Sequence, residues 1–160
     1  MKIALIYFSY SGHTRRIVSM LKEKLKEKVD VFEIKAKEPY SSDYDTVVEL
    51  GQEEVNQGLL RAIKDLDIPL ERYEHIILAT PVWWYTIPPV VHTFLTKYDL
   101  KEKEVMPLIT YGGWLGHTIE DMKEYCPKAT DGFLLKFDGD NLVTDQETID
   151  KIEKEIEEWK

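Results

Sequence analysis

The chain has 160 residues, of which 43% are hydrophobic and 32% are charged. This composition is typical of a folded globular protein and excludes a disordered chain, and the length fits a single domain over residues 1–160. The formal net charge is −9. Nucleic acid is therefore not an expected partner, because duplex binding requires a basic face.

One cysteine, Cys126, excludes a framework of disulfide bonds, so we expect a reducing compartment, the cytoplasm. We expect Cys126 to be inert packing, because no arginine follows it at the Cys-x5-Arg spacing of a phosphatase loop. The first apolar run, 3–8, is too short for a secretory or membrane-spanning segment, so no membrane partner is expected. The four histidines match no metal-ligand spacing and predict no metal site.

Five short stretches have the length and pattern of β-strands: 2–8, 29–35, 75–80, 105–111 and 132–137. Four of them are mainly apolar runs, and the first and third are apolar at nearly every residue. This pattern is typical of strands buried on both faces, as in a parallel sheet. The stretch 29–35 nearly alternates apolar and charged residues, which suits an edge strand.

The segments between these strands are helical in period. Apolar residues recur at helical spacing in three segments: 17–25, 91–98 and 149–159. The connection 36–74 is long, and it holds a predicted helix over 45–63 that Gly51 and Gly58 interrupt. The alternation of strands and helices predicts an α/β domain with parallel strands and right-handed crossovers.

Two threonines are predicted to cap helices. A short helix is expected to begin near Thr118, where Thr118 and Asp121 have the spacing of a capping box. Thr144 and Glu147 have the same spacing ahead of the last helix. We therefore expect the hydroxyl groups of Thr118 and Thr144 to accept hydrogen bonds from the first turns of these two helices.

The loop after the first strand has the features of an anion site. In open α/β sheets, ligands bind beyond the carboxyl ends of the strands. Residues 9–14, SYSGHT, lie at such an end and run straight into a helix. Their hydroxyl groups, glycine and free backbone amides predict an anion cradle; the alternative is a capped helix start without a ligand. Two arginines follow, Arg15 and Arg16. They are interpreted either as partners of a bound phosphate or as solvated surface residues.

The loops after the third and fourth strands predict a surface for a planar group. The segment PVWWYTIPP at 81–89 places three consecutive aromatic residues between prolines. Tryptophan there provides a flat face for stacking, and the alternative is a hydrophobic cluster over the sheet end. Gly112 and Gly113 precede Trp114 in the next loop, where glycine lets the backbone approach a ligand and where the alternative is a plain turn. Together the three loops predict a site for a planar ring that carries a phosphate.

The motifs YFSYSGHT, PVWWYTIPPVVHTFL and TYGGWLGHTIEDMKEYCPKA resemble the flavodoxin-like family, in particular a branch with a PxWWxxxP second loop. The resemblance implies the flavodoxin-like three-layer doubly wound α/β fold, with a five-stranded parallel sheet in the order 2-1-3-4-5 and non-covalently bound FMN. The cofactor-binding residues that it implies are Ser9, Tyr10, Ser11, Gly12, His13, Thr14, Pro81, Val82, Trp83, Trp84, Tyr85, Thr110, Tyr111, Gly112, Gly113 and Trp114.

Two residues depart from the family pattern. His13 stands where asparagine is usual, which changes one side-chain contact of the phosphate loop. Tyr85 stands where glycine is usual, and glycine accepts a positive φ without a steric penalty. Tyrosine does not, so we expect a left-handed backbone to be disfavoured at Tyr85.

The resemblance implies a low-potential electron carrier that uses FMN between a reductase and acceptor enzymes. The alternatives are an FMN-dependent NAD(P)H or quinone oxidoreductase on the same fold, and a binding module for another nucleotide. We favour the carrier, since no second dinucleotide motif is visible and flavin chemistry requires no protein acid or base. No catalytic residue is therefore predicted. The net charge of −9 predicts redox partner proteins with basic surfaces.

Overall fold

The structure is a computed structural model that describes residues 2–58 and 60–159. Strands and helices alternate along most of the chain, as the sequence predicts. The elements are β1 (Ile3–Tyr7), α1 (His13–Leu25), η1 (Lys26–Lys28), β2 (Val29–Glu33), α2 (Tyr44–Asn56), η2 (Leu70–Arg72), β3 (His75–Pro81), α3 (Pro89–Lys97), β4 (Glu104–Tyr111), α4 (Thr118–Tyr125), β5 (Phe133–Asp138), β6 (Asn141–Leu142) and α5 (Gln146–Glu158).

The sheet has the order β2-β1-β3-β4-β5-β6. Strands β1 to β5 are parallel, so the predicted order 2-1-3-4-5 is confirmed. The sixth strand was not predicted: β6 has two residues and pairs antiparallel with the end of β5. Gly139 makes this tight hairpin possible with a φ of 58°. Among the described residues, no helix is both long and apolar enough to cross a membrane.

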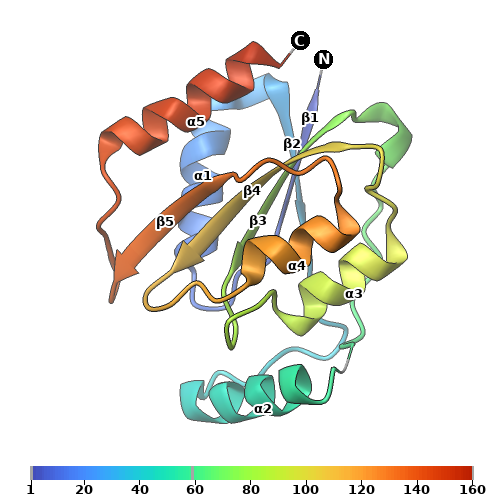
Figure 1. The fold of residues 1–160 in the computed structure, drawn as a ribbon, viewed down its shortest axis with the longest axis vertical. Helices are drawn as coiled ribbons and strands as arrows, with labels where there is room; N and C mark the ends of the chain where they lie inside the picture. The colour runs from blue at the N-terminus through green and yellow to red at the C-terminus, as the bar shows by residue number, and fades with distance from the viewer. Residues whose placement is uncertain (1, 59, 160) are drawn as a thin grey trace.

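Helices cover both faces of the sheet, as Figure 1 shows. Helices α1 and α5 pack on one face, and α3 and α4 pack on the other. The buried strands supply both cores because successive side chains point to opposite faces. In β1, for example, Leu5 packs toward α1 and α5, whereas Ile6 packs toward α3 and α4. Cys126 is fully buried in the second of these cores, and burial raises the pKa of its thiol to about 12.

Helix α2 covers neither face. Figure 1 shows it beyond the carboxyl end of the sheet, where α3 is a neighbouring helix. The helix continues without interruption through Gly51 and ends at Asn56, so the expected break at Gly51 and the extension to residue 63 are wrong. Gly51 lies within the helix and faces the side chains of Trp83 and Trp84. Gly58, with a φ of 63°, lies just beyond the helix end.

Both predicted capping boxes are also wrong. The carboxylate of Asp145, one residue after Thr144, accepts the backbone N–H of Thr148 at 3.0 Å and caps α5. The Thr144 hydroxyl instead accepts the backbone N–H of Lys136 at 2.8 Å. Thr118 is already the first residue of α4, so its hydroxyl reaches back and donates to the Leu115 carbonyl at 2.8 Å.

Gly132 allows β5 to enter the sheet beside β4. It has a φ of 65°, and a Cβ added there would lie 2.1 Å from the carbonyl oxygen of Pro107. We predict that Gly132→Ala lowers the free energy of unfolding by about 3 kcal/mol, since backbone strain and overlap add together. Gly139→Ala is the matched control: its φ is 58° but its Cβ meets nothing within 4 Å. Equal losses for both variants in urea denaturation would contradict this account.

Candidate functional site

A cavity of about 520 Å³ lies at the carboxyl end of the parallel strands. Its walls come from the loops after β1, β3 and β4, from helix α2 and from the end of β5. The lining residues are Tyr10, Ser11, His13, Thr14, Tyr44, Val47, Val48, Gly51, Pro81, Val82, Trp83, Trp84, Thr110, Tyr111, Gly112, Phe137 and Gly139. All three predicted loops therefore meet around one space, which is the geometry of ligand sites in open α/β sheets.

Most of the predicted site residues line this cavity, but Ser9, Gly12, Tyr85, Gly113 and Trp114 do not. The sequence reasoning missed the walls formed by α2, namely Tyr44, Val47, Val48 and Gly51, and by Phe137 and Gly139. One signal of the α2 wall was present in the sequence: a glycine within an otherwise regular helix often marks a close contact.

The loop after β1 ends at the N-terminus of α1. Gly12 precedes the helix with a φ of 98°, and the first helical turn holds no acidic residue. The Ser9 hydroxyl accepts the backbone N–H of Arg15 at 3.2 Å, so Ser9 serves the helix start and does not face the cavity. Ser11 and Thr14 do line the cavity beside the positive end of the helix dipole. This arrangement suits an anion.

Thr14 and Thr110 join two of the predicted loops. Their hydroxyl oxygens lie 2.7 Å apart, and both side chains are buried. Either hydroxyl can be the donor of this bond, and each retains a lone pair or a proton for a further partner. The bond therefore fixes the anion loop of α1 against the end of β4 and leaves polar groups at the cavity wall.

His13 is held by the β5–β6 hairpin. Its ring stacks flat on Phe137, with centroids 4.3 Å apart and an interplanar angle of 2°. Its Nε2 lies 3.0 Å from Oδ1 of Asp140. Arg16 donates to the Asp140 carbonyl at 2.9 Å. The residue that departs from the family pattern thus belongs to a small cluster that closes one end of the cavity.

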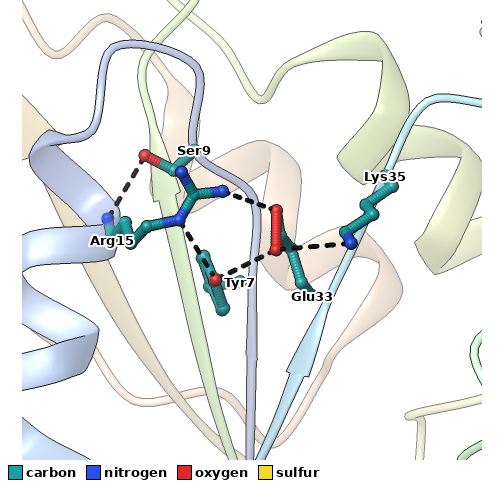
Figure 2. A network of polar contacts seen from close by, with 5 residues as sticks. All are labelled: Tyr7, Ser9, Arg15, Glu33 and Lys35. Carbon is teal, nitrogen blue, oxygen red and sulfur yellow. Dashed lines mark hydrogen bonds and ion pairs between the residues drawn. The ribbon is translucent and has the colours of Figure 1, made fainter. Parts of the chain in front are cut away.

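Arg15 points to the opposite side, toward β2. Its Nη2 donates to Oε2 of Glu33 at 2.8 Å, and its Nε donates to the Tyr7 hydroxyl at 3.4 Å (Figure 2). Lys35 lies 4.0 Å from the same carboxylate. The Tyr7 hydroxyl and then the Glu33 charge raise the pKa of the Arg15 guanidinium. Arg15 does not line the cavity, and it is an exposed residue within a surface ion-pair network, which fits the interpretation as a solvated surface residue.

The two tryptophans form a wall with α2. Trp83 packs edge-on against Phe8 and Tyr40, with ring centroids 5.5 and 4.9 Å apart. The Trp84 Nε1–H donates to the Val48 carbonyl of α2 at 3.0 Å. A Cβ on Gly51 would lie 3.3 Å from Cε3 of Trp83, which is closer than an ordinary van der Waals contact. Glycine at position 51 therefore lets helix α2 approach both indole rings.

Trp84 and Tyr85 both have left-handed backbones, with φ values of 48° and 68°. They form a two-residue turn that Trp83 and Thr86 close with backbone bonds of 2.9 and 3.2 Å. Tyr85 therefore adopts the left-handed backbone that the sequence predicts to be disfavoured there. A two-residue hairpin turn of this hand requires positive φ at both positions, and the surrounding contacts offset about 1–2 kcal/mol of strain per residue.

The loop after β4 contributes less to the cavity than the sequence predicts. Gly112 lines the cavity, whereas Gly113 and Trp114 do not. Trp114 is 71% exposed, and its ring lies 4.7 Å from that of Tyr85, which is 45% exposed. Tyr85 in the turn and Trp114 beside it form an exposed pair instead of a wall of the cavity.

An ion pair fixes α2 to the segments that flank it. Nη1 of Arg61 lies 2.6 Å from Oε1 of Glu54, and Nη2 donates to the Glu38 carbonyl at 3.0 Å. The guanidinium lies over the Tyr40 ring at 3.9 Å. Burial and then the Glu54 charge raise the pKa of Tyr40. Because Tyr40 contacts Trp83, this cluster connects the ends of α2 to the aromatic wall.

We predict that Glu54→Ala destabilises the protein by about 3 kcal/mol, because it leaves the Arg61 guanidinium partly buried without its counter-charge. Tryptophan near-UV circular dichroism should change as well, since the Tyr40–Trp83 contact loosens. Glu49→Ala is the control, because Glu49 is exposed on the same helix. A stability loss no larger than that of the control would show that the ion pair does not hold α2 in place.

Comparison with known proteins supports the resemblance in the sequence. The sequence pattern of the family described as flavodoxin matches residues 2–157. A candidate flavoprotein from Bacteroides eggerthii is 28% identical, with a TM-score of 0.79 and 98% of each chain covered. A flavoprotein from Lactobacillus acidophilus, solved in complex with FMN, is 19% identical, with a TM-score of 0.69 over 84% of this chain and 90% of that one.

Oxidised flavodoxin 2 from Bacillus cereus is 19% identical, with a TM-score of 0.59 over 98% of this chain and 95% of that one. At 19% identity, the last two structures support the fold alone. A comparison with curated proteins found no significant match. The family match covers nearly the whole chain and agrees with the observed sheet order and with the three loops at its carboxyl end. The chain therefore belongs to the flavodoxin family.

Proposed function

We propose that this protein binds FMN in the cavity and carries electrons between a reductase and acceptor enzymes in the cytoplasm. The observation that supports the proposal is the position of two unlike surfaces in one cavity. A hydroxyl-lined helix N-terminus lies at one part of it, and an indole wall lies at another. A phosphate and a planar ring on one ligand would match these two surfaces.

The cavity fits such a cofactor in size and chemistry. Its volume of about 520 Å³ is within the range of small-molecule sites. Ser11, Thr14 and the amide groups at the start of α1 would hold the phosphate. Trp83 and Trp84 would contact the ring and exclude water from it. The bound flavin would supply the redox chemistry, so the chain itself needs to bind and orient the group and no more.

The overall charge supports a protein partner. With a net charge of −9, the molecule produces a negative field that attracts proteins with basic surfaces. Tyr85 of the turn and Trp114 beside it are both exposed, and such an aromatic pair would instead suit stacking of a planar substrate. That second observation favours the alternative, an FMN-dependent NAD(P)H or quinone oxidoreductase, so the experiments must separate the two.

Thr14→Val tests the phosphate assignment. The variant keeps the volume of the side chain but removes the buried hydroxyl. Because hydrogen bonds to charged groups contribute about 1.5–3 kcal/mol, the affinity for FMN should fall by about one to two orders of magnitude. Riboflavin, which has no phosphate, should bind nearly as before. Thr96→Val, which removes an exposed hydroxyl on α3, is the control. Equal losses for FMN and riboflavin would contradict the assignment.

Turnover without a partner distinguishes carrier from enzyme. We expect the purified FMN-loaded protein alone to oxidise NADH or NADPH only slowly with a quinone as acceptor. Reduction by a basic-faced reductase should be fast at low ionic strength and should slow markedly toward physiological salt, because salt screens the attraction. Sustained turnover by the protein alone would support the oxidoreductase. A reductase rate that does not change with salt would argue against electrostatic docking.

A further inference from the structure

We propose that Asp121 is a positioning residue that holds the Trp84–Tyr85 turn in its left-handed conformation. The carboxylate lies on α4, outside the cavity lining, and acts on the turn through its neighbours. Its effect on a bound cofactor rests on the proposed function, whereas its effect on the turn does not. Non-glycine residues in left-handed conformations persist where the surroundings restrain them, and such sites are commonly functional.

The turn lacks the residues that would favour it locally. Two-residue hairpin turns with positive φ at both positions normally use asparagine, aspartate or glycine. Here the two positions are Trp84 and Tyr85, so the sequence of the turn does not account for its conformation. The restraint must therefore come from contacts with other segments.

Asp121 provides such a contact. Its Oδ2 accepts a hydrogen bond from the hydroxyl of Thr86, the residue that closes the turn. The same oxygen lies within hydrogen-bond distance of Nδ1 of His117. The backbone N–H of His117 donates in turn to the Tyr85 carbonyl at 2.8 Å. The Asp121 carboxylate therefore links Thr86, which closes the turn, with His117, which donates a hydrogen bond to the Tyr85 carbonyl.

The backbone beside the turn is fitted closely to it. Gly116 has a φ of 60°, and a Cβ there would lie 2.2 Å from the Tyr85 carbonyl oxygen. The loop before α4 can therefore contact Tyr85 only with glycine at this position. On the other side, Trp84 donates its indole N–H to Val48 of α2. The turn is held between α2 and α4, and loosening the α4 side would free the wall that Trp84 forms.

The hollow around Asp121 holds further ionisable groups. Its lining includes Thr86, His92, His117, Glu124 and Tyr125, and it has a volume of about 290 Å³. Burial lowers the pKa of His92, while the charges of Asp121 and Glu124 oppose that effect. The His92 ring is paired with the Tyr125 hydroxyl. His92 therefore faces Asp121 as a neighbour, whereas Thr86 and His117 are its hydrogen-bonding partners.

Amide hydrogen exchange measured by NMR on the full chain without added ligand tests the proposal. In Asp121→Ala, protection of the amides of Thr86 and His117 should fall by about tenfold or more, since these amides donate to Trp83 and Tyr85 within the turn. The Cys126 amide, which donates to Met122 in α4, should stay within about twofold. Unchanged protection at Thr86 and His117 would overturn the proposal, and so would an equal loss at Cys126.

Two further variants exclude a general structural effect. Asp121→Asn keeps an oxygen acceptor for Thr86, so protection at Thr86 should remain closer to that of the wild type. Glu124→Ala, on the same helix and in the same hollow, should leave both amides unchanged. The same loss in Glu124→Ala as in Asp121→Ala would show that the charge of the hollow, and not Asp121 itself, maintains the turn.

A double variant tests the restraint of strain. In a Tyr85→Gly background position 85 is free of the steric penalty, whereas Trp84 keeps its own. Asp121→Ala should therefore reduce protection of the His117 amide by a smaller factor than it does in the wild-type background. An equal loss in both backgrounds would overturn the proposal. In binding assays, Asp121→Ala should weaken FMN and riboflavin to the same degree, unlike Thr14→Val. If neither flavin binds the wild type, the proposed function fails while the exchange result still decides the role of Asp121.

Discussion

Helix α2 packs against Trp83 and Trp84 across the carboxyl end of the sheet, and this contact forms one wall of the cavity. The sheet and its four covering helices would form an α/β core without α2, but the ends of the strands would then be open to solvent. Gly51 permits the approach, and the Glu54–Arg61 pair fixes the helix to its flanking segments. A helix that covers no core of its own is thereby kept in place by contacts with the site.

The anion cradle depends on local charge and not on the charge of the whole molecule. The chain is acidic overall, yet the first turn of α1 holds no carboxylate. Arg15 is paired with Glu33, and Arg16 is bonded to Asp140, so neither lines the cavity. The positive potential there comes from the backbone amides and the helix dipole, which act at short range. A negative outer field is therefore compatible with the proposed anion site.

The aromatic wall formed by Trp83 and Trp84 is held in place by contacts with other segments of the chain. The Trp84–Tyr85 turn is strained, and α4 and the glycine before it restrain the turn from one side while α2 restrains it from the other. This division places Trp84, which lines the cavity, on a fixed support. Tyr85 and Trp114 are both exposed and do not line the cavity.

The sequence alone determined the five parallel strands, their alternation with helices and the three loops at one sheet edge. Apolar periodicity and the placing of glycine and proline are local signals, which is why these features could be predicted. The sequence also identified Thr14 and Trp84 through their positions after strands. Only the tertiary structure decided that α2 forms a wall, that Asp145 replaces Thr144 as a cap, and that Tyr85 adopts a positive φ. Each of these depends on groups distant in the chain whose contacts outweigh local preference, and no local pattern encodes such contacts.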